Sequence, residues 1–279
     1  MGTSKSYSGP KNGTDLLPSW YSSTSGEGGI AGSAAGSTPE EVLKPETLPQ
    51  QSQIPIKAND WNAAKSSYTR LRNNPTPNKI HNALRSYVRS SGGHKAIARS
   101  AIGGKKTTIR LGGFLRDIVN IGLAKALENL NITDYKGKPV KTVLAMLISV
   151  LSPKDGTNED SIARLALVET IKKLYKEHDL LEKGVDSLSA LKEEDINTVI
   201  EYYISSYIYQ RWTQELGNRI EGKDVSYKKL ELMESRCRGF ISSKVKNKFS
   251  KTSSIIIVKN IEKAINDIYD VAYYMMEGL

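Results

Sequence analysis

The chain is poor in the residues that build disulfide-rich folds and metal sites, with one cysteine and three histidines among 279 residues. A lone thiol cannot form an intrachain disulfide or a thiolate metal site, so both are excluded for this chain alone, and Cys237 is expected to be a partly buried bystander. The histidines His81, His94 and His178 show no HxxxH or HExxH spacing. We therefore expect no metal site and no histidine-based catalytic triad.

Long apolar runs are also absent. No stretch of about 18 or more apolar residues occurs, and the N-terminus lacks the charged-then-apolar pattern of a secretion signal. These absences predict a cytoplasmic protein without a membrane span.

Catalytic motifs are incomplete where they occur. The segment 217–223, GNRIEGK, has the spacing of a P-loop, but Asp224 stands where Ser or Thr should hold magnesium, and a helix rather than a strand is expected before it. Residues 103–108, GGKKTT, match only the lower half of such a loop and are interpreted as a basic loop. The carboxylate pairs at 40–41 and 193–194 lie in a tail and at a helix start, where solvation or the helix dipole explains them. The sequence predicts a non-enzymatic protein without a cofactor.

Residues 1–58 are rich in Gly, Ser, Thr and Pro. Such a segment buries too little apolar surface to offset its ordering entropy, so we expect a long disordered tail. The exception is 16–21, LLPSWY, which we interpret as a short docking element with Leu17 and Trp20 as partner-recognition residues. Accidental hydrophobicity is the alternative.

Residues 59–279 show apolar residues at helical spacing and no convincing strand alternation. We expect an all-α, bundle-like body. Asn158 or Asp160 is expected to cap one of its helices. The expected helices are 78–89, 94–102, 111–130, 140–151, 158–175, 187–216 and 255–276.

Acidic residues are absent from 65–116, a block with twelve Lys or Arg, and from a second run, 235–260. The two runs together can form a positive face. A face of this kind binds DNA, RNA or an acidic partner, or is simply solvated, and the sequence leaves these alternatives open. No recognition helix or zinc finger is apparent, so sequence-specific reading of bases is not expected.

Within the block, cations recur four residues apart. Such pairs project to one side of a helix, where they can contact successive phosphates. The candidate residues for binding nucleic acid or an acidic partner are Arg85, Arg89, Lys95, Arg99, Lys105, Lys106 and Arg110.

The chain opens with Met1, Gly2, Thr3 and Ser4. Because glycine follows, the methionine should be removed, which leaves an unhindered α-amine on Gly2. The opening also fits the myristoylation pattern, but that alternative requires a eukaryotic-type host, and we expect no membrane partner.

Two segments carry a family resemblance. Residues 1–20, MGTSKSYSGPKNGTDLLPSW, resemble the start of QatB proteins, which open with MGTS, a Gly/Pro/Ser stretch and an apolar-Pro-Trp patch. Residues 80–103, IHNALRSYVRSSGGHKAIARSAIG, resemble the family's Ala-Leu-x-x-Tyr-x-Arg core followed by Gly-Gly and a small basic helix. The Lys- and Ile-rich C-terminal half and the longer tail at 26–53 depart from the pattern.

The resemblance implies a component of the QatABCD anti-phage defence system, with an ATPase (QatA), a QueC-like enzyme (QatC) and a TatD-like nuclease (QatD) as partners. It also implies that the QueC-like partner joins a 7-deazaguanine group to Gly2 and recognises Thr3 and Ser4. The expected function is a non-catalytic subunit whose helical body is a docking scaffold. The alternative is a nucleic-acid-binding subunit that acts through 65–116.

Overall fold

In the computed structural model, every regular element among the described residues is helical, and the all-α expectation is confirmed. The described residues are 58–154, 156–217, 226–249 and 261–278. They lie in one compact unit. The elements are α1 (Ala58–Asn73), α2 (Pro77–Ser90), α3 (His94–Arg99), α4 (Ile102–Ile121), α5 (Leu123–Asn129), α6 (Val140–Leu151), α7 (Asn158–Glu177), α8 (Leu180–Lys183), the 3-10 helix η1 (Val185–Ala190), α9 (Glu193–Gly217), α10 (Tyr227–Phe249) and α11 (Ile261–Glu277).

The expected tail lies outside the described residues, and so does most of the 217–223 segment. The site residues that fall there are Gly2, Thr3, Ser4, Leu17 and Trp20.

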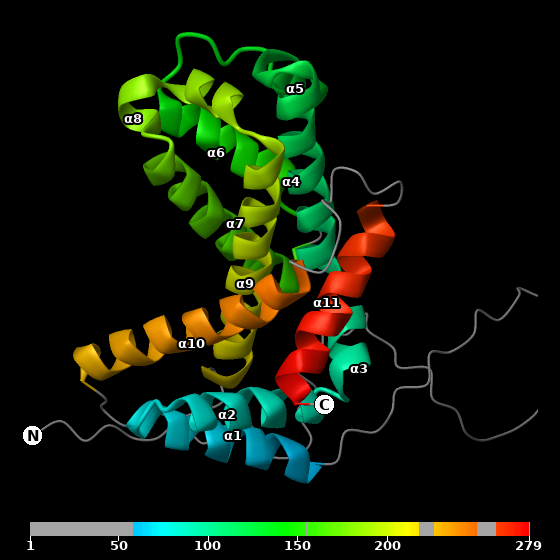
Figure 1. Cartoon of the computed structure of the whole chain (residues 1–279), viewed down its shortest axis with the longest axis vertical. Helices are drawn as coiled ribbons and strands as arrows, with labels where there is room; N and C mark the ends of the chain where they lie inside the picture. The colour runs from blue at the N-terminus through cyan, green and yellow to red at the C-terminus, as the bar shows by residue number, and fades with distance from the viewer. Residues whose placement is uncertain (1–57, 155, 218–225, 250–260, 279) are drawn as a thin grey trace, which may run out of the picture. The chain divides into compact units, whose positions relative to one another are not determined.

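Helices α1 and α2 pack as a hairpin at one end of the unit (Figure 1). Pro77 occupies the first turn of α2, where a missing N–H costs no helical hydrogen bond. Thr76 caps the helix, because its Oγ1 accepts a hydrogen bond from the Lys79 amide at 3.4 Å. The helix expected after the two prolines is therefore present, with Ile80 and Leu84 on its buried face.

The pair Gly103 and Gly104 lies in the first turn of α4, so the interpretation of this segment as a basic loop is wrong. A Cβ on Gly104 would lie 2.6 Å from the ring of Tyr207. The glycines therefore allow α4 to approach α9 closely instead of interrupting a helix. The single helix expected at 111–130 is two helices, because Gly122 has a φ of +87° and ends α4.

Helix α7 begins with a reciprocal cap. Thr157 Oγ1 accepts a hydrogen bond from the Asp160 amide at 3.1 Å, and Asp160 Oδ2 accepts one from the Thr157 amide at 3.0 Å. This is a capping box, and Thr157 is the cap in place of the expected Asn158 or Asp160. Helix α6 has the expected bounds, Val140–Leu151.

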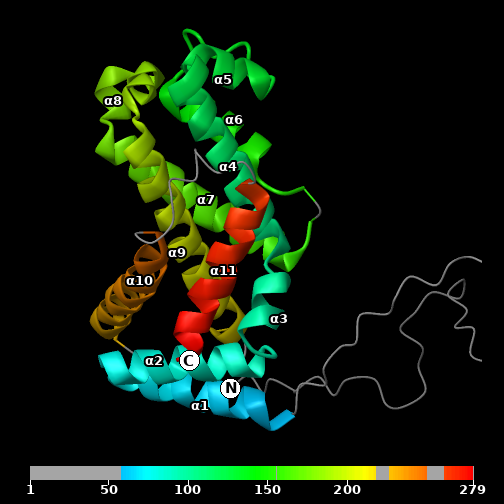
Figure 2. The same ribbon diagram turned by 45° about the vertical axis from the view of Figure 1, so that its right-hand side comes forward.

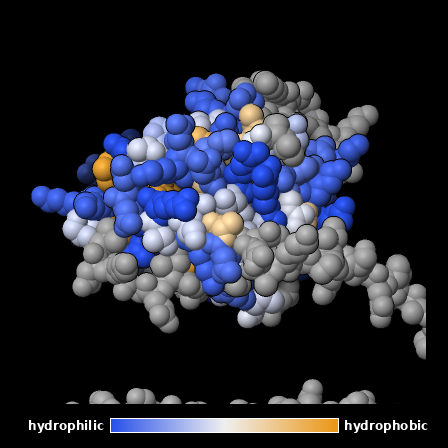
Figure 3. All heavy atoms as spheres, turned by 90° about the horizontal axis from the view of Figure 1, so that it is seen from below, coloured by the Kyte–Doolittle hydropathy of each residue, from blue (hydrophilic) through white to orange (hydrophobic). Residues whose placement is uncertain are grey.

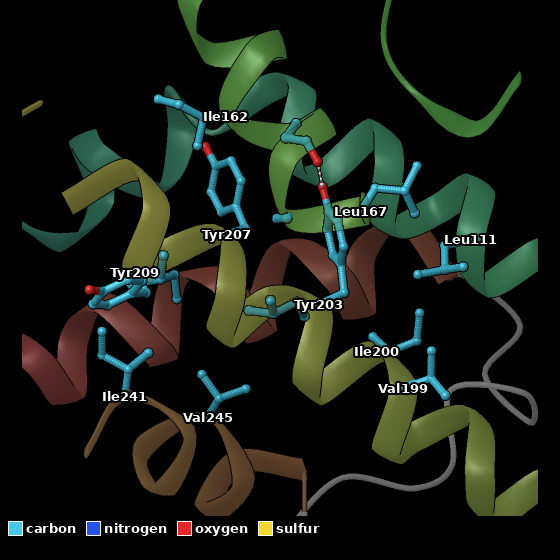
Figure 4. Packing of buried hydrophobic residues seen from close by; sticks show 14 of the residues in the cluster. Leu111, Ile162, Leu167, Val199, Ile200, Tyr203, Tyr207, Tyr209, Ile241 and Val245 are labelled. Atoms are coloured by element: carbon cyan, nitrogen blue, oxygen red, sulfur yellow. Dashed lines mark hydrogen bonds between the residues drawn. The ribbon is translucent and has the colours of Figure 1, made fainter. Parts of the chain in front are cut away.

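Helix α9 is the central helix of the core and packs against α7, α10 and α4. It buries Tyr203 and Trp212 completely, and the Tyr203 hydroxyl donates to the carbonyl of Ala163 in α7 at 3.3 Å (Figure 4). The helix expected at 187–216 starts instead as η1, and α9 begins at Glu193. The aromatic residues of α9 therefore lie where three other helices converge.

Helix α11 packs against α2, α3, α4 and α10 (Figures 1 and 2). Ile265, Ile268 and Ala272 are buried, as the predicted apolar stripe requires. Residues 255–260 of the expected helix lie outside the described residues.

The end of α11 is fixed to the start of α3. Glu277 Oε2 accepts a hydrogen bond from the His94 amide at 3.1 Å and lies 2.7 Å from His94 Nδ1. The ring of Tyr274 also contacts the His94 ring edge-on, with centroids 5.2 Å apart. One acid at the last residue of α11 thus joins two helices that are far apart in sequence.

The single cysteine belongs to the core. Cys237 is fully buried in α10, and burial raises the pKa of its thiol to about 12, so it is an inert core residue. Among the described helices, none combines the length and apolar character needed to cross a membrane.

Candidate functional site

Three of the predicted cations line one depression, formed by α3, α4 and α11. Lys95 and Arg99 are exposed and one turn apart on α3, and Lys105 projects from the start of α4. The depression has a volume of about 350 Å³. Its remaining lining residues are Ala98, Asn266, Asp267 and Asp270.

The depression carries charge of both signs. Three cations face the carboxylates of Asp267 and Asp270, which makes the lining only weakly positive. The Lys105 ammonium lies 5.9 Å from the centre of the Tyr269 ring, and burial lowers its pKa while the charge of Asp270 opposes that shift. A lining of this kind suits a polar protein surface better than a row of phosphates.

A network of buried polar groups lies directly behind the depression. The Tyr269 hydroxyl is 3.0 Å from Thr108 Oγ1, and its ring packs edge-on against Tyr207. The Tyr207 hydroxyl donates to Glu159 Oε1 at 2.5 Å. Burial raises the pKa of Tyr207 well above its ordinary value of 10.0, so Tyr207 remains a neutral donor.

The Glu159 carboxylate binds the free amides in the first turn of α4. It accepts hydrogen bonds from the amides of Gly103 at 2.5 Å and Gly104 at 3.0 Å. These amides belong to the first turn of a helix, which leaves its N–H groups without intrahelical partners and carries partial positive charge. An acid at the start of α7 therefore caps α4 from outside.

Arg211 of α9 extends the network toward α2 and α3. Its guanidinium donates to the Ile97 carbonyl at 3.2 Å, to Ser100 Oγ at 2.8 Å and to Glu215 Oε1 at 2.8 Å. Glu215 also accepts a hydrogen bond from the Tyr87 hydroxyl at 2.9 Å. Because the donors and carboxylates of this network are occupied with one another, its geometry fits the positioning of α2, α3, α4 and α9.

The other predicted cations do not join the depression. Arg85 and Arg89 lie on α2, and the side chain of Arg85 runs toward the end of α11 near Gly278. Arg110 donates to the carbonyl of Ser152 at 2.8 Å, which fixes α4 to the end of α6. The seven residues thus occupy several parts of the body.

Sequence reasoning missed the residues of the network. Glu159, Tyr207 and Arg211 come from helices that were predicted, but nothing in their local spacing indicates a contact with Gly103 or Gly104. The adjacent glycines were the available signal, since paired small residues on a helix permit close packing. Among the described residues no cluster of His, Cys, Asp or Glu could hold a metal ion.

Comparison with known proteins identifies the family. A family model described as Qat anti-phage system associated protein QatB matches residues 92–276, well over half of the chain. The match covers the helices that form the depression and all the helices of the network except α2. No curated protein matches, and no solved structure matches. The chain therefore belongs to the QatB family of proteins associated with the Qat anti-phage system.

Proposed function

We propose that this protein is the non-catalytic substrate and adaptor subunit of a cytoplasmic Qat defence complex, and that a QueC-like partner conjugates a 7-deazaguanine group to Gly2. The observation that carries the proposal is the family match over 92–276, together with the MGTS opening of the chain. Thr3 and Ser4 follow Gly2 into the recognition groove of the enzyme.

The length of the N-terminal segment supports delivery of Gly2 to another protein. The described body begins with α1 at Ala58. A coil of Gly/Ser-rich composition and of about 56 residues has a root-mean-square span of roughly 40 Å, which is enough to reach a partner's active site. In this proposal the terminus enters the enzyme without any unfolding of the body, and Leu17 and Trp20 bind the partner's surface.

The helical body acts in this proposal as the docking scaffold for the ATPase and, in the assembled system, for the TatD-like nuclease. The depression between α3, α4 and α11 supports this assignment, because Lys95 and Arg99 are exposed beside Asp267 and Asp270. Mixed charges on a polar rim favour specific protein recognition over general anion binding.

Intact mass spectrometry tests the covalent part of the proposal. The protein is purified with and without its neighbouring genes, and the N-terminal peptide is fragmented. We expect an added mass on Gly2 that requires the QueC-like partner. A Gly2→Ala variant should lack it, whereas the matched control Gly9→Ala should keep it; an unmodified Gly2 in cells that contain every partner contradicts the proposal.

Charge reversal tests the docking part. Lys95→Glu with Arg99→Glu should weaken copurification of the ATPase while leaving modification of Gly2 intact. Lys172→Glu with Lys176→Glu is the matched control, because these lysines are exposed on α7. Equal loss of the ATPase in both variants would show that general charge, and not the depression, controls docking.

A further inference from the structure

Helices α2 and α10 contact each other, and in the view of Figure 1 both run from left to right. The Arg236 guanidinium, in the middle of α10, donates to the carbonyl of Pro75 just before α2. About a turn and a half further along α2, the ring of His81 lies 6.2 Å from the ring of Phe240. The order of contacts is therefore the same along both helices.

This pairing brings together the two acid-free runs of the sequence. Helix α2 contains no Asp or Glu, and neither does α10 from residue 235 to its end at Phe249. Figure 3 shows the end of the body that α1 and α2 form, where the described side chains are mostly hydrophilic. Neither of these two segments therefore supplies an acid to the cations between them, whereas Asp267 and Asp270 lie beside Lys95 and Arg99.

Arg85 and Lys244 are the central cations of this region. The Lys244 ammonium lies 5.2 Å from the centre of the Phe240 ring. Burial, and then the charges of Lys244 and Arg85, lower the pKa of His81, which places both cations near the same imidazole. Arg85 Nε is buried, and among the described residues it has no hydrogen-bond acceptor.

The C-terminal end of α11 balances only part of the positive charge of Arg85 and Lys244. A Cβ on Gly278 would lie 2.7 Å from His81 Nε2 and 3.9 Å from Arg85 Cδ, so the C-terminal end of α11 is adjacent. A helix C-terminus carries roughly half a negative charge. Arg85 and Lys244 carry two full positive charges, which is more than a helix terminus alone balances.

Two exposed cations extend the row. Arg89 lies one turn beyond Arg85 on α2, and Arg236 lies two turns before Lys244 on α10. Residues one turn apart are spaced about 6 Å along a helix. That spacing is close to the distance spanned by two phosphates of one strand along the axis of a duplex, where each strand carries one charge per about 3.4 Å.

We propose that Arg85, Arg89, Arg236 and Lys244, called here the α2–α10 face, bind the phosphate backbone of a nucleic acid. An acidic protein would present carboxylates at irregular positions, whereas the face presents cations at helical steps without an interspersed acid. Phe240 is half-buried between His81 and Lys244 and offers no open ring for base stacking, so binding is independent of sequence.

The test measures binding of the full-length protein to a fluorescein-labelled 20-base-pair duplex of random sequence, by anisotropy, between 50 and 200 mM salt. Four phosphate contacts predict a slope of about −3.6 in a plot of log K against log salt, which is a loss of about 150-fold over this range. Arg85→Gln with Lys244→Gln should reduce the slope to about −1.8.

Lys173→Gln with Lys246→Gln is the matched control, since it removes the same charge elsewhere. Lys173 pairs with Glu177 at 3.0 Å, and the charge of Lys246 acts on Glu201 of α9. This control should keep the wild-type slope. Arg89→Gln gives a second test without risk to the core, because Arg89 is exposed, and it should reduce the slope by about 0.9.

Three results would overturn the proposal. The first is that the wild-type protein does not bind the duplex at 50 mM salt, and the second is that the control loses as much affinity as the Arg85/Lys244 variant. Alternatively, poly-glutamate could bind as tightly through the same four residues, which would assign the face to an acidic protein. Modification of Gly2 is measured separately, so failure here leaves the proposed function intact.

Discussion

The carboxylate of Glu159 occupies the space that a side chain at Gly103 would need. A Cβ on Gly103 would lie 2.5 Å from Glu159 Oε2, the same oxygen that accepts the hydrogen bond of the Gly103 amide. The glycine is therefore required for the capping of α4 by α7. A larger residue would separate the acid from the amides that it satisfies.

The neighbouring glycine gives the first prediction. Gly104→Ala would place a methyl group 2.6 Å from the ring of Tyr207, which is buried and held by Glu159. Because the ring cannot move without breaking that hydrogen bond, we expect a loss of about 1–3 kcal/mol in the free energy of unfolding. Urea denaturation followed by circular dichroism measures it.

Gly113→Ala is the matched control for this prediction. Gly113 lies in the same helix, and a Cβ there would meet no atom within 4 Å. Alanine is the better helix former, so this variant should gain up to about 1 kcal/mol. If both substitutions stabilise the protein, close packing against Tyr207 is not the reason for a glycine at position 104.

The sequence predicts the helical class because periodic apolar residues report directly on local structure. Helix α6 has the predicted bounds, since Pro139 and Pro153 flank it and fix both ends. Gly122 shows where such reasoning fails. Its φ of +87° divides the predicted helix 111–130, but a glycine in an apolar periodic pattern does not reveal whether the helix continues through it.

The candidate site was less predictable than the helices. The cations at 85–110 are visible in the sequence, yet whether they share a surface depends on how α2, α3 and α4 pack. The hydrogen bonds of Tyr87 with Glu215 and of Tyr207 with Glu159 join residues 128 and 48 positions apart. No local pattern encodes such pairs, because tertiary packing alone brings them together.

Arg211 gives the second prediction. Its side chain is buried and donates through three nitrogens to four acceptors, which are the Ile97 carbonyl, Ser100 Oγ, the Tyr207 hydroxyl and Glu215 Oε1, a geometry that lysine cannot reproduce. Arg211→Lys should lower the free energy of unfolding by about 2–4 kcal/mol, because Ser100 Oγ loses the guanidinium donor and the Ile97 carbonyl keeps only the hydrogen bond from the Ser100 hydroxyl. Differential scanning calorimetry should show a lower Tm.

Arg164→Lys is the control for Arg211, since Arg164 is exposed on α7. It should change stability by less than about 0.5 kcal/mol. Equal effects of the two substitutions would mean that the guanidinium contacts of Arg211 contribute nothing beyond charge.

The third prediction concerns stability at high pH. Burial raises the pKa of Cys237 from 9.0 to about 12 and that of Tyr68 from 10.0 to about 12. The folded protein keeps these protons while the unfolded chain releases them, so stability is fully present below pH 9 and falls as the pH rises toward 12. Between pH 9 and 10 the cysteine should make the largest single contribution, at up to about 1.4 kcal/mol per pH unit, because its unfolded pKa is below that of the buried tyrosines.

Cys237→Ala isolates that contribution. The variant is less stable at every pH because it leaves a cavity, but its stability should change less between pH 9 and 10 than that of the wild type. Above pH 10 Tyr68 titrates in both proteins, but the difference in slope between them should persist up to about pH 12, because the folded wild-type protein keeps the thiol proton until then. Rapid alkylation of Cys237 by iodoacetamide in the native protein at pH 8 would contradict its burial.

The fourth prediction concerns the contact that fixes the end of α11. Glu277→Gln keeps an oxygen that can accept a hydrogen bond from the His94 amide. It removes the negative charge that lies 2.7 Å from His94 Nδ1. We expect a loss of about 1–2 kcal/mol, concentrated in the last turns of α11 and in α3. Hydrogen exchange should accelerate at Tyr273 and Met276 while the amides of α7 keep their protection.

Glu262→Gln is the matched control at the opposite end of the same helix. Glu262 is exposed in the first turn of α11, where its charge complements the helix dipole by about 0.3–1 kcal/mol. Its replacement should leave exchange near His94 unchanged. If Glu277→Gln also leaves that exchange unchanged, packing of Ile265, Ile268 and Ala272 holds α11 without help from the acid, and the His94 contact adds no local stability.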